Sequence, residues 1–204
     1  MLNERLRKTL QEVSCFYDQR KVGDVGFLGF RRSSDLTKVF ACIDELIRKR
    51  ILVPYRSLFL DMGCADGRVN VLLSYLVKKS AGVEIDEWTL EEYGPLRKDL
   101  ENRLGEMGLI IPPDNIFLFN GDTTEDRIHK SIYDQMGVSF EDFDLFYTYL
   151  TMYEEFSNLI VRKGKRGSVL MLYGIEKVIP KLEGLKLLTP EAPLNGILAL
   201  YRKR

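Results

Sequence analysis

Residues 59–68 read FLDMGCADGR, an apolar run that passes into a loop rich in glycine. The apolar side chains before Asp61 are typical of a buried β-strand, and an amphipathic pattern begins after Gly67. Glycines between a strand and a helix let a ligand approach the backbone and the positive N-terminal end of the helix. The segment therefore predicts a strand, a ligand-binding loop and a helix, in that order.

Several classes of ligand are bound by loops of this kind, and the residue types separate them. A phosphate-binding Walker loop ends in Gly-Lys-Ser/Thr, whereas Gly67 is followed by Arg68 and Val69, so this class is excluded. A dinucleotide loop needs small residues at its first, third and sixth places. Gly63 and Ala65 satisfy this rule, but Arg68 occupies the sixth place. An NAD-binding protein is therefore disfavoured and is kept as an alternative.

The chain beyond residue 56 alternates short apolar runs with amphipathic stretches. The runs predict strands, and the stretches between them predict helices. The strands are expected at 57–62, 81–85, 115–119, 143–149 and 168–173, and the helices at 66–79, 86–107, 124–136 and 151–163. Because the strands are apolar on both faces, they indicate a doubly wound α/β fold with a mostly parallel sheet. The runs at 185–189 and 196–204 predict an antiparallel pair at one edge.

The first 50 residues precede this alternation. Apolar residues at helical spacing predict helices at about 1–18 and 35–50. Residues 20–34 between them break the periodicity, and we expect a loop that is either a lid over a bound ligand or a plain connector. The lid interpretation rests on three glycines and on four large or basic side chains, namely Gly23, Gly26, Gly29, Phe27, Phe30, Arg31 and Arg32.

The pattern acidic-x-Gly-x-small-x-Gly at residues 61–67 resembles motif I of the class I S-adenosylmethionine (SAM)-dependent methyltransferases. The resemblance continues at the ends of the following strands, in the family's order, with Gly82-Val83-Glu84-Ile85-Asp86, Asn120-Gly121-Asp122 and Phe143-Asp144-Leu145-Phe146. It covers about residues 35–204. It implies a Rossmann-like, seven-stranded sheet in the order 3-2-1-4-5-7-6, with strand 7 antiparallel, preceded by a helical N-terminal extension.

The resemblance also implies SAM as cofactor and a set of residues that bind it. The acid that ends the second strand, here Glu84, accepts both ribose hydroxyls, and the acid after the third strand, here Asp122, lies beside the adenine amino group. The charge agrees, because a carboxylate such as Asp61 favours the sulfonium and amino groups of SAM and repels a pyrophosphate. The full set is Asp61, Gly63, Cys64, Ala65, Gly67, Glu84, Ile85, Asp122 and Thr123.

These residues also have ordinary structural interpretations. Asp61 is a potential cap for the next helix, Glu84 a solvated turn residue, and Asp122 with Thr123 a common turn followed by a helix cap. Ala65 departs from the family, which has glycine at this place. We expect the alanine to cost little, provided that the local backbone does not require a positive φ angle.

The sequence of the fourth predicted strand gives information about the methyl acceptor. Many amino-group methyltransferases of the family carry Asn/Asp-Pro-Pro-Tyr there, whereas this chain has Tyr149 at the first place, which argues against adenine, cytosine or glutamine-amide acceptors. Tyr149 is the candidate catalytic residue. A weaker resemblance, carried by Asp66-Gly67-Arg68, Gly82-Val83-Glu84 and the tyrosines, is to seven-strand protein-lysine methyltransferases, in which tyrosine rings can surround an ammonium group. For Tyr147 packing against the sheet is the preferred interpretation, and for Tyr149 it is the alternative.

The predicted activity is SAM-dependent methyl transfer to a protein, RNA or small-molecule acceptor, with a protein lysine preferred. Because the Pro-Pro motif and an obvious base are missing, a SAM- or nucleotide-binding module without transferase activity is an alternative. His129, the one histidine of the chain, is interpreted as a surface residue.

Composition restricts the remaining properties. The 204 residues include 30 basic and 30 acidic side chains, and the zero net charge excludes binding to nucleic acid by bulk electrostatics. Three scattered cysteines indicate no disulfide framework and no metal site, and hence a reducing, cytoplasmic location. No apolar run reaches about 18 residues, so no membrane contact is expected. We expect one domain over 1–204, with an extension at 1–50 and a core at 57–204, and leave the oligomeric state open.

Overall fold

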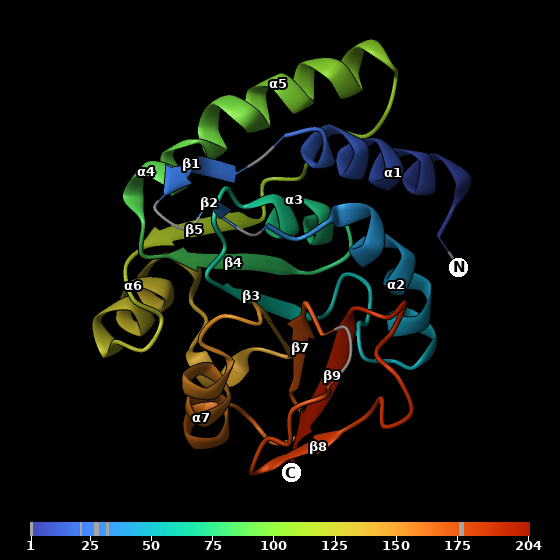
Figure 1. The fold of residues 1–204 in the computed structure, drawn as a ribbon. Coiled ribbons are helices and arrows are strands. Elements are labelled where there is room, and N and C mark those ends of the chain that lie inside the picture. Colours follow the sequence, from blue (N-terminus) through green and yellow to red (C-terminus); the bar gives the residue numbers. More distant parts are fainter. Residues whose placement is uncertain (1, 21, 27–28, 32, 176–177) are drawn as a thin grey trace.

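The structure, a computed structural model, describes residues 2–20, 22–26, 29–31, 33–175 and 178–204. Figure 1 labels most of its elements, which are numbered in chain order. They are α1 (Glu4–Asp18), β1 (Val22–Gly26), β2 (Gly29–Arg31), α2 (Leu36–Arg48), β3 (Leu58–Met62), α3 (Arg68–Ser74), β4 (Lys79–Glu84), α4 (Glu87–Glu91), α5 (Tyr93–Glu106), β5 (Ile116–Asn120), α6 (Asp126–Met136), the 3-10 helix η1 (Phe140–Asp142), β6 (Leu145–Tyr149), α7 (Tyr153–Lys163), β7 (Val169–Tyr173), β8 (Leu185–Leu187) and β9 (Leu198–Lys203).

The main sheet has seven strands in the order β5-β4-β3-β6-β7-β9-β8. Strands β5, β4, β3, β6 and β7 run parallel to one another, whereas β9 is antiparallel to both β7 and β8. Counted from β3, this is the predicted order 3-2-1-4-5-7-6 with strand 7 antiparallel, so the predicted fold is confirmed. In parallel α/β sheets of this kind, ligands bind at the carboxyl ends of the strands, where the order reverses beside β3.

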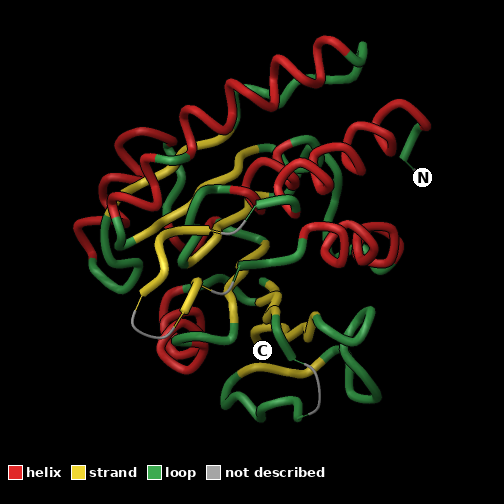
Figure 2. Tube along the Cα trace, turned by 45° about the horizontal axis from the view of Figure 1, so that its top comes forward, coloured by secondary structure: helices red, strands yellow, loops and turns green. Residues whose placement is uncertain are grey.

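Helices cover both faces of the sheet (Figures 1 and 2). One apolar core joins α1, α2, α3 and α5 to one face, and it includes Phe59 of β3. A second core joins α6 and α7 to the opposite face, and it includes the neighbouring residue Leu60. Because successive side chains of a strand point to opposite faces, a run of consecutive apolar residues is what such a sheet requires.

The N-terminal extension differs from its prediction between the two helices. Both helices form, with Asn3 and Asp35 as side-chain caps, but residues 22–26 and 29–31 pair as an antiparallel hairpin rather than an irregular loop. The valines at 22 and 25 favour a strand, and the glycines at 26 and 29 pair with each other across the two strands. The expected lid residues Phe27 and Arg32 lie outside the described residues.

Two core helices also differ from their predicted bounds. The helix expected over 66–79 begins at Arg68, because the glycine loop continues as far as Gly67. The helix expected over 86–107 is divided at Glu92 into α4 and α5. Pro95 has no backbone N–H to donate to the carbonyl of Glu91, which explains the interruption.

Candidate functional site

The glycine loop, residues 63–67, connects β3 to α3 at the carboxyl edge of the sheet. The amides of Gly63 and Cys64 both donate to the carbonyl of Val83 on β4, with N–O distances of 2.9 and 3.0 Å. Gly63 has a φ angle of +85°, and a Cβ placed there would meet no atom of the described chain within 4 Å. The loop therefore turns an open stretch of backbone outward, as a bound ligand requires.

Ala65 does not have the backbone conformation on which its expected low cost depends. Its φ angle is +50°, in the left-handed region that favours glycine. An L-residue with a side chain pays about 1–2 kcal/mol there, because Cβ approaches the following carbonyl oxygen. The departure from the family pattern thus leaves the loop with local strain.

Gly67 and Gly82 serve the packing beneath the loop. A Cβ on Gly67 would lie 2.9 Å from Cδ1 of Leu118, and one on Gly82 would lie 2.6 Å from Oδ1 of Asn70. Gly67 also has a φ angle of +74° as the N-cap of α3. These glycines allow α3 to pack closely on β4 and β5.

Asp61 is a buried acid at the end of β3. Its side chain is 2% exposed, and Oδ1 has no hydrogen-bond partner among the described residues. Burial, together with the nearby charges of Glu84 and Asp66, raises the pKa of this carboxyl well above its usual range. It is not the cap of α3, whose N-cap is Gly67 and whose first amide, that of Arg68, donates to Oδ1 of Asp66. A buried oxygen without a partner is costly, and a ligand with a cationic or N–H donor group would satisfy it.

Glu84 links the glycine loop to the end of β4. It is 7% exposed, its Oε2 accepts from the amide of Ala65 at 2.9 Å, and its Oε1 accepts from the amide of Asp86 at 3.0 Å. The interpretation as a solvated turn residue is therefore wrong. Each carboxylate oxygen can accept more than one hydrogen bond, which is the property that recognition of two hydroxyl groups requires.

Asp122, Thr123 and Ile85 surround the adjacent strand ends. Oδ1 of Asp122 accepts from both the amide and the hydroxyl of Thr124 at 2.8 Å, which confirms the turn interpretation for this residue. Thr123 is buried and does not cap α6, whose N-cap is Glu125, so that interpretation is wrong. Ile85 is 70% exposed at the end of β4 and offers an apolar surface. The ends of β4 and β5 meet because the amide of residue 121 donates to the carbonyl of Glu84.

Cys64 lies beneath the loop rather than on its surface. The side chain is buried, and burial followed by the charge of Asp61 raises the pKa of its thiol well above the usual range. The thiol therefore stays protonated, in agreement with the expectation of a packing residue and not a nucleophile.

The candidate catalytic residue Tyr149 ends β6, on the other side of β3 from Glu84 and Asp122. Its half-buried ring lies 5.5 Å from the ring of Tyr173 on β7. The structure brings Asp61, Glu84 and the loop together and places Tyr149 at the end of the strand next to β3, two residues beyond the partner of Asp61. Tyr147 is buried, and its hydroxyl lies 2.6 Å from Oγ of Ser34, so its predicted packing role is confirmed.

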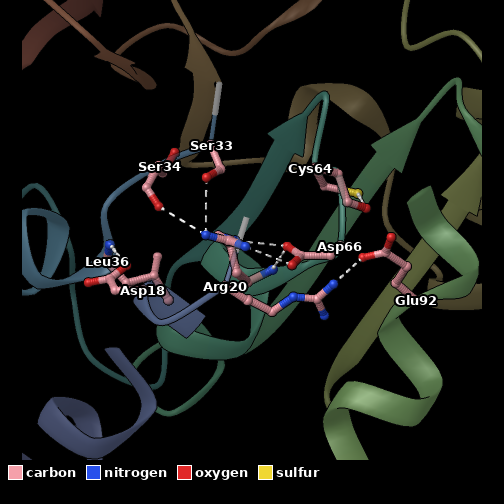
Figure 3. A network of polar contacts seen from close by, with 10 residues as sticks. Asp18, Arg20, Ser33, Ser34, Leu36, Cys64, Asp66 and Glu92 are labelled. Carbon is pink, nitrogen blue, oxygen red and sulfur yellow. Dashed lines mark hydrogen bonds and ion pairs between the residues drawn. The ribbon is translucent and has the colours of Figure 1, made fainter. Parts of the chain in front are cut away.

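Sequence reasoning missed a buried ion pair beside the loop. Nε and Nη2 of Arg68 donate to the two oxygens of Asp66 at 3.0 and 2.9 Å, and both side chains are less than 5% exposed. Nη1 of Arg68 donates to Oγ of Ser33 at 3.2 Å, from the segment before α2. Figure 3 shows Ser33 and Ser34 on one side of this network and Asp66 on the other. The available signal was the sequence Asp66-Gly67-Arg68, which was used to compare ligand classes and families but not to predict an ion pair.

His129 was also misjudged, because it is not a surface residue. Its side chain is 11% exposed, packs at 4.6 Å on the ring of Phe140, and donates from Nε2 to the carbonyl of Thr123 at 2.8 Å. Burial and the neighbouring Lys163 lower the pKa of the imidazole, whereas its bond to Thr123 opposes this shift. His129 supports the turn that carries Asp122.

The described part of the chain comprises residues 2–20, 22–26, 29–31, 33–175 and 178–204. Within it, no group of three or more His, Cys, Asp and Glu side chains is arranged to hold a metal ion. None of the helices in those ranges combines the length and the apolar character that a membrane-spanning segment requires.

Neither a protein-family model nor a curated protein matches the chain. Several solved structures do. The tRNA (m1A58) methyltransferase TrmI from Aquifex aeolicus is 12% identical, with 96% of this chain and 76% of that chain covered and a TM-score of 0.54. The putative methyltransferase yhhF from Escherichia coli is 14% identical, with coverages of 85% and 88% and a TM-score of 0.51. An RNA methyltransferase from Salinibacter ruber, in complex with S-adenosyl-L-homocysteine (SAH), is 16% identical, with coverages of 85% and 92% and a TM-score of 0.50. The chain therefore has a Rossmann-like methyltransferase fold, as its resemblance to the class I enzymes implies.

Proposed function

We propose that this protein binds SAM at the glycine loop and transfers its methyl group to an acceptor. The observation that carries the proposal is that Oδ1 of Asp61 has no hydrogen-bond partner among the described residues, although it is buried at the end of β3 beside Glu84 and the open backbone at Gly63. The fold supports it, since the similar structures are methyltransferases and one of them holds SAH.

The residues present fit the charges and the hydrogen-bonding groups of SAM. Its amino and sulfonium groups are cationic, and a buried carboxylate that lacks a partner stabilises a cation strongly. A dinucleotide fits less well, because Asp61 would face a pyrophosphate with like charge. Glu84 is assigned to the ribose hydroxyls, Asp122 to the adenine amino group and Ile85 to the apolar face of the adenine ring.

The other cofactor residues are assigned supporting roles. Gly63 and Ala65 present backbone to the cofactor, whereas Cys64, Gly67 and Thr123 are buried or packed and shape the two loops. Gly63 is exposed and Ala65 half-buried, so their backbone is the part of the loop that a ligand can reach from solvent.

The cofactor supplies an electrophilic methyl group, so the protein has mainly to orient the acceptor and keep its attacking atom unprotonated. Tyr149 is the residue proposed to contact the acceptor, since it ends β6 at the same edge of the sheet as Asp61. The alternative of a SAM-binding module without transfer keeps the same cofactor site and differs only in turnover.

The proposed acceptor is the amino group of a protein lysine. The rings of Tyr149 and Tyr173 lie side by side at the strand ends, and tyrosine faces attract an ammonium group. The zero net charge of the chain gives no bulk attraction for RNA, although two of the similar structures act on RNA by their names. The free cysteines of the chain support a reducing, cytoplasmic location.

Labelling of a cell extract with SAM that carries a tritiated methyl group tests the proposal. We expect label in the protein fraction and little label in the RNA and small-molecule fractions. Addition of SAH before the reaction is expected to suppress the labelling. Label in RNA alone would overturn the lysine acceptor and retain the transferase. Binding of SAM without label in any fraction would favour the module without transfer. In the same assay, Tyr149→Phe is expected to slow labelling without weakening SAH binding.

Trp88 offers a direct readout of cofactor binding in solution. It is the only tryptophan of the chain, it is 81% exposed, and it lies in α4, directly after the Glu84–Asp86 turn. Its fluorescence is expected to change when SAH occupies the site and not when the same concentration of NAD is added.

A further inference from the structure

A short segment before α2 is held against the sheet by polar contacts. We call residues 33–35 the linker, because they join the hairpin to α2. Oγ of Ser34 lies 2.6 Å from the hydroxyl of Tyr147, and the amide of Asp35 donates to the hydroxyl of Tyr173 at 3.0 Å. Tyr147 and Tyr173 belong to the adjacent strands β6 and β7, so the linker is docked on the strands that lead to the proposed acceptor side.

The same linker is attached to the glycine loop through one side chain. Arg68 uses Nε and Nη2 for Asp66, and its Nη1 lies 3.2 Å from Oγ of Ser33 and 3.5 Å from the carbonyl of Ser34. The guanidinium carbon also lies 5.6 Å from the ring centre of Tyr17 on α1. Arg68 is thus the shared partner of the loop, the linker and α1.

The chemistry of this junction depends on the planar fork of arginine. Guanidinium has donors on two edges, so it can pair with both oxygens of Asp66 and still donate to the linker from Nη1. A lysine ammonium at the same place can neutralise Asp66. It does not pair with both oxygens of Asp66 and at the same time donate to the linker in the planar arrangement of arginine. The pair is buried, and removing one partner would leave an uncompensated charge.

The hairpin is therefore fixed at both of its ends beside the cofactor site. After the hairpin, the linker is held by Arg68 and the two tyrosines. Before it, Arg20 forms an ion pair with Glu92 at 2.6 Å, at the junction of α4 and α5 (Figure 3). Strand β1 also contacts α4, which follows Glu84.

We infer that Arg68 is a positioning residue that couples occupancy of the cofactor site to the order of the linker. The inference rests on the proposed function, because the ligand of the loop is taken to be SAM or SAH. Ala65, whose amide is held by Glu84, immediately precedes Asp66, so a ligand that immobilises the loop also immobilises the carboxylate that holds Arg68. The linker then becomes ordered without touching the ligand itself.

Hydrogen exchange of the linker amides, with and without SAH, tests this coupling in the intact protein. In the wild type, SAH is expected to slow exchange at residues 33–35 by about tenfold. In Arg68→Lys, SAH still binds, as shown by Trp88 fluorescence, but the protection of the linker is lost. Arg103→Lys is the matched control, since its partner Glu12 lies on α1, away from the linker, and it is expected to behave as the wild type.

The outcomes separate this inference from the proposed function. If SAH neither binds nor changes Trp88 fluorescence in the wild type, both are overturned. If SAH binds and the linker is protected equally in wild type and Arg68→Lys, only the coupling is overturned. Should Arg68→Lys fail to fold, the double variant Asp66→Asn with Arg68→Met removes both buried charges, and the same loss of protection is expected.

Discussion

The backbone amide of Ala65 donates a hydrogen bond to Oε2 of Glu84 over 2.9 Å. This bond fixes the loop after β3 to the end of β4, so the residue expected to bind the ribose also sets the shape of the loop expected to hold the amino end of SAM. Two parts of the proposed site are therefore one structural unit, and a change at Glu84 should be felt in both binding and stability.

Glu84→Ala should weaken SAM binding by about 1–3 kcal/mol, because a charged acceptor for the ribose hydroxyls is lost. It should also lower the free energy of unfolding, since the amides of Ala65 and Asp86 lose their acceptor. Titration calorimetry and thermal unfolding measure the two effects. Glu155→Ala, an exposed change on α7, is the control, and equal behaviour of both variants would contradict the assignment.

Asp61→Asn should raise stability and reduce cofactor affinity. The folded pKa of Asp61 is raised above its ordinary value of 3.8, so the folded state binds more protons than the unfolded state, and stability falls as pH rises from 3.8 towards the folded pKa. Asparagine does not ionise, so the free energy of unfolding of the variant should exceed that of the wild type by about 1–3 kcal/mol at neutral pH. Near pH 4 the two proteins should be equally stable.

The same variant should bind SAM about 1.5–3 kcal/mol more weakly, the usual worth of a hydrogen bond to a charged group. In the wild type, a bound cation favours the ionised carboxylate, so SAM affinity should increase with pH. The increase should stop once the pH exceeds the pKa of Asp61 in the ligand-free protein. Calorimetry across pH checks this trend. Asp134→Asn on α6 is the control, and an unchanged affinity in Asp61→Asn would remove Asp61 from the site.

Ala65→Gly should stabilise the protein by about 0.5–1 kcal/mol, because relief of the left-handed backbone strain exceeds the added flexibility of the unfolded chain. Chemical denaturation measures this change. The control is Ala41→Gly in the exposed part of α2, which should cost about 1 kcal/mol. Destabilisation of similar size at both positions would show that the φ angle of Ala65 carries no strain.

His129 should make stability depend on pH below neutrality. Its folded pKa lies below the ordinary 6.5, so the unfolded state binds the proton more readily. The contribution of the neutral ring is complete above pH 6.5 and is lost as pH falls through the folded pKa. The free energy of unfolding, measured from pH 7 to 5, should decrease as pH falls in the wild type. This slope should disappear in His129→Gln. A slope that persists in the variant would assign the effect to other groups.

The strands were predictable from sequence because the patterns that mark them are local, whereas their order was implied by the resemblance to the class I methyltransferases. Apolar runs such as residues 169–173 are typical of a strand buried on both faces, and the acids at strand ends follow from their position in the chain. The split between α4 and α5 was readable in principle, since Pro95 breaks the hydrogen-bond ladder of a single helix.

The contacts that complete the site were not predictable, because they depend on packing between distant residues. Arg68 and Ser33 are 35 positions apart, and no periodicity relates them. The φ angle of Ala65 is set by the loop as a whole, and the sequence shows only that alanine replaces glycine. The burial of His129 results from the ring of Phe140, which lies on the segment beyond α6. In each case the contact or backbone angle depends on tertiary packing, which local sequence patterns do not specify.

The central claim is that the glycine loop binds SAM. Titration calorimetry of the wild type with SAM, and with NAD and ATP under the same conditions, tests it most directly. We predict saturable binding of SAM with one molecule per chain, strongly reduced in Asp61→Asn, and no binding of NAD or ATP. Saturable binding of NAD without binding of SAM would contradict the account.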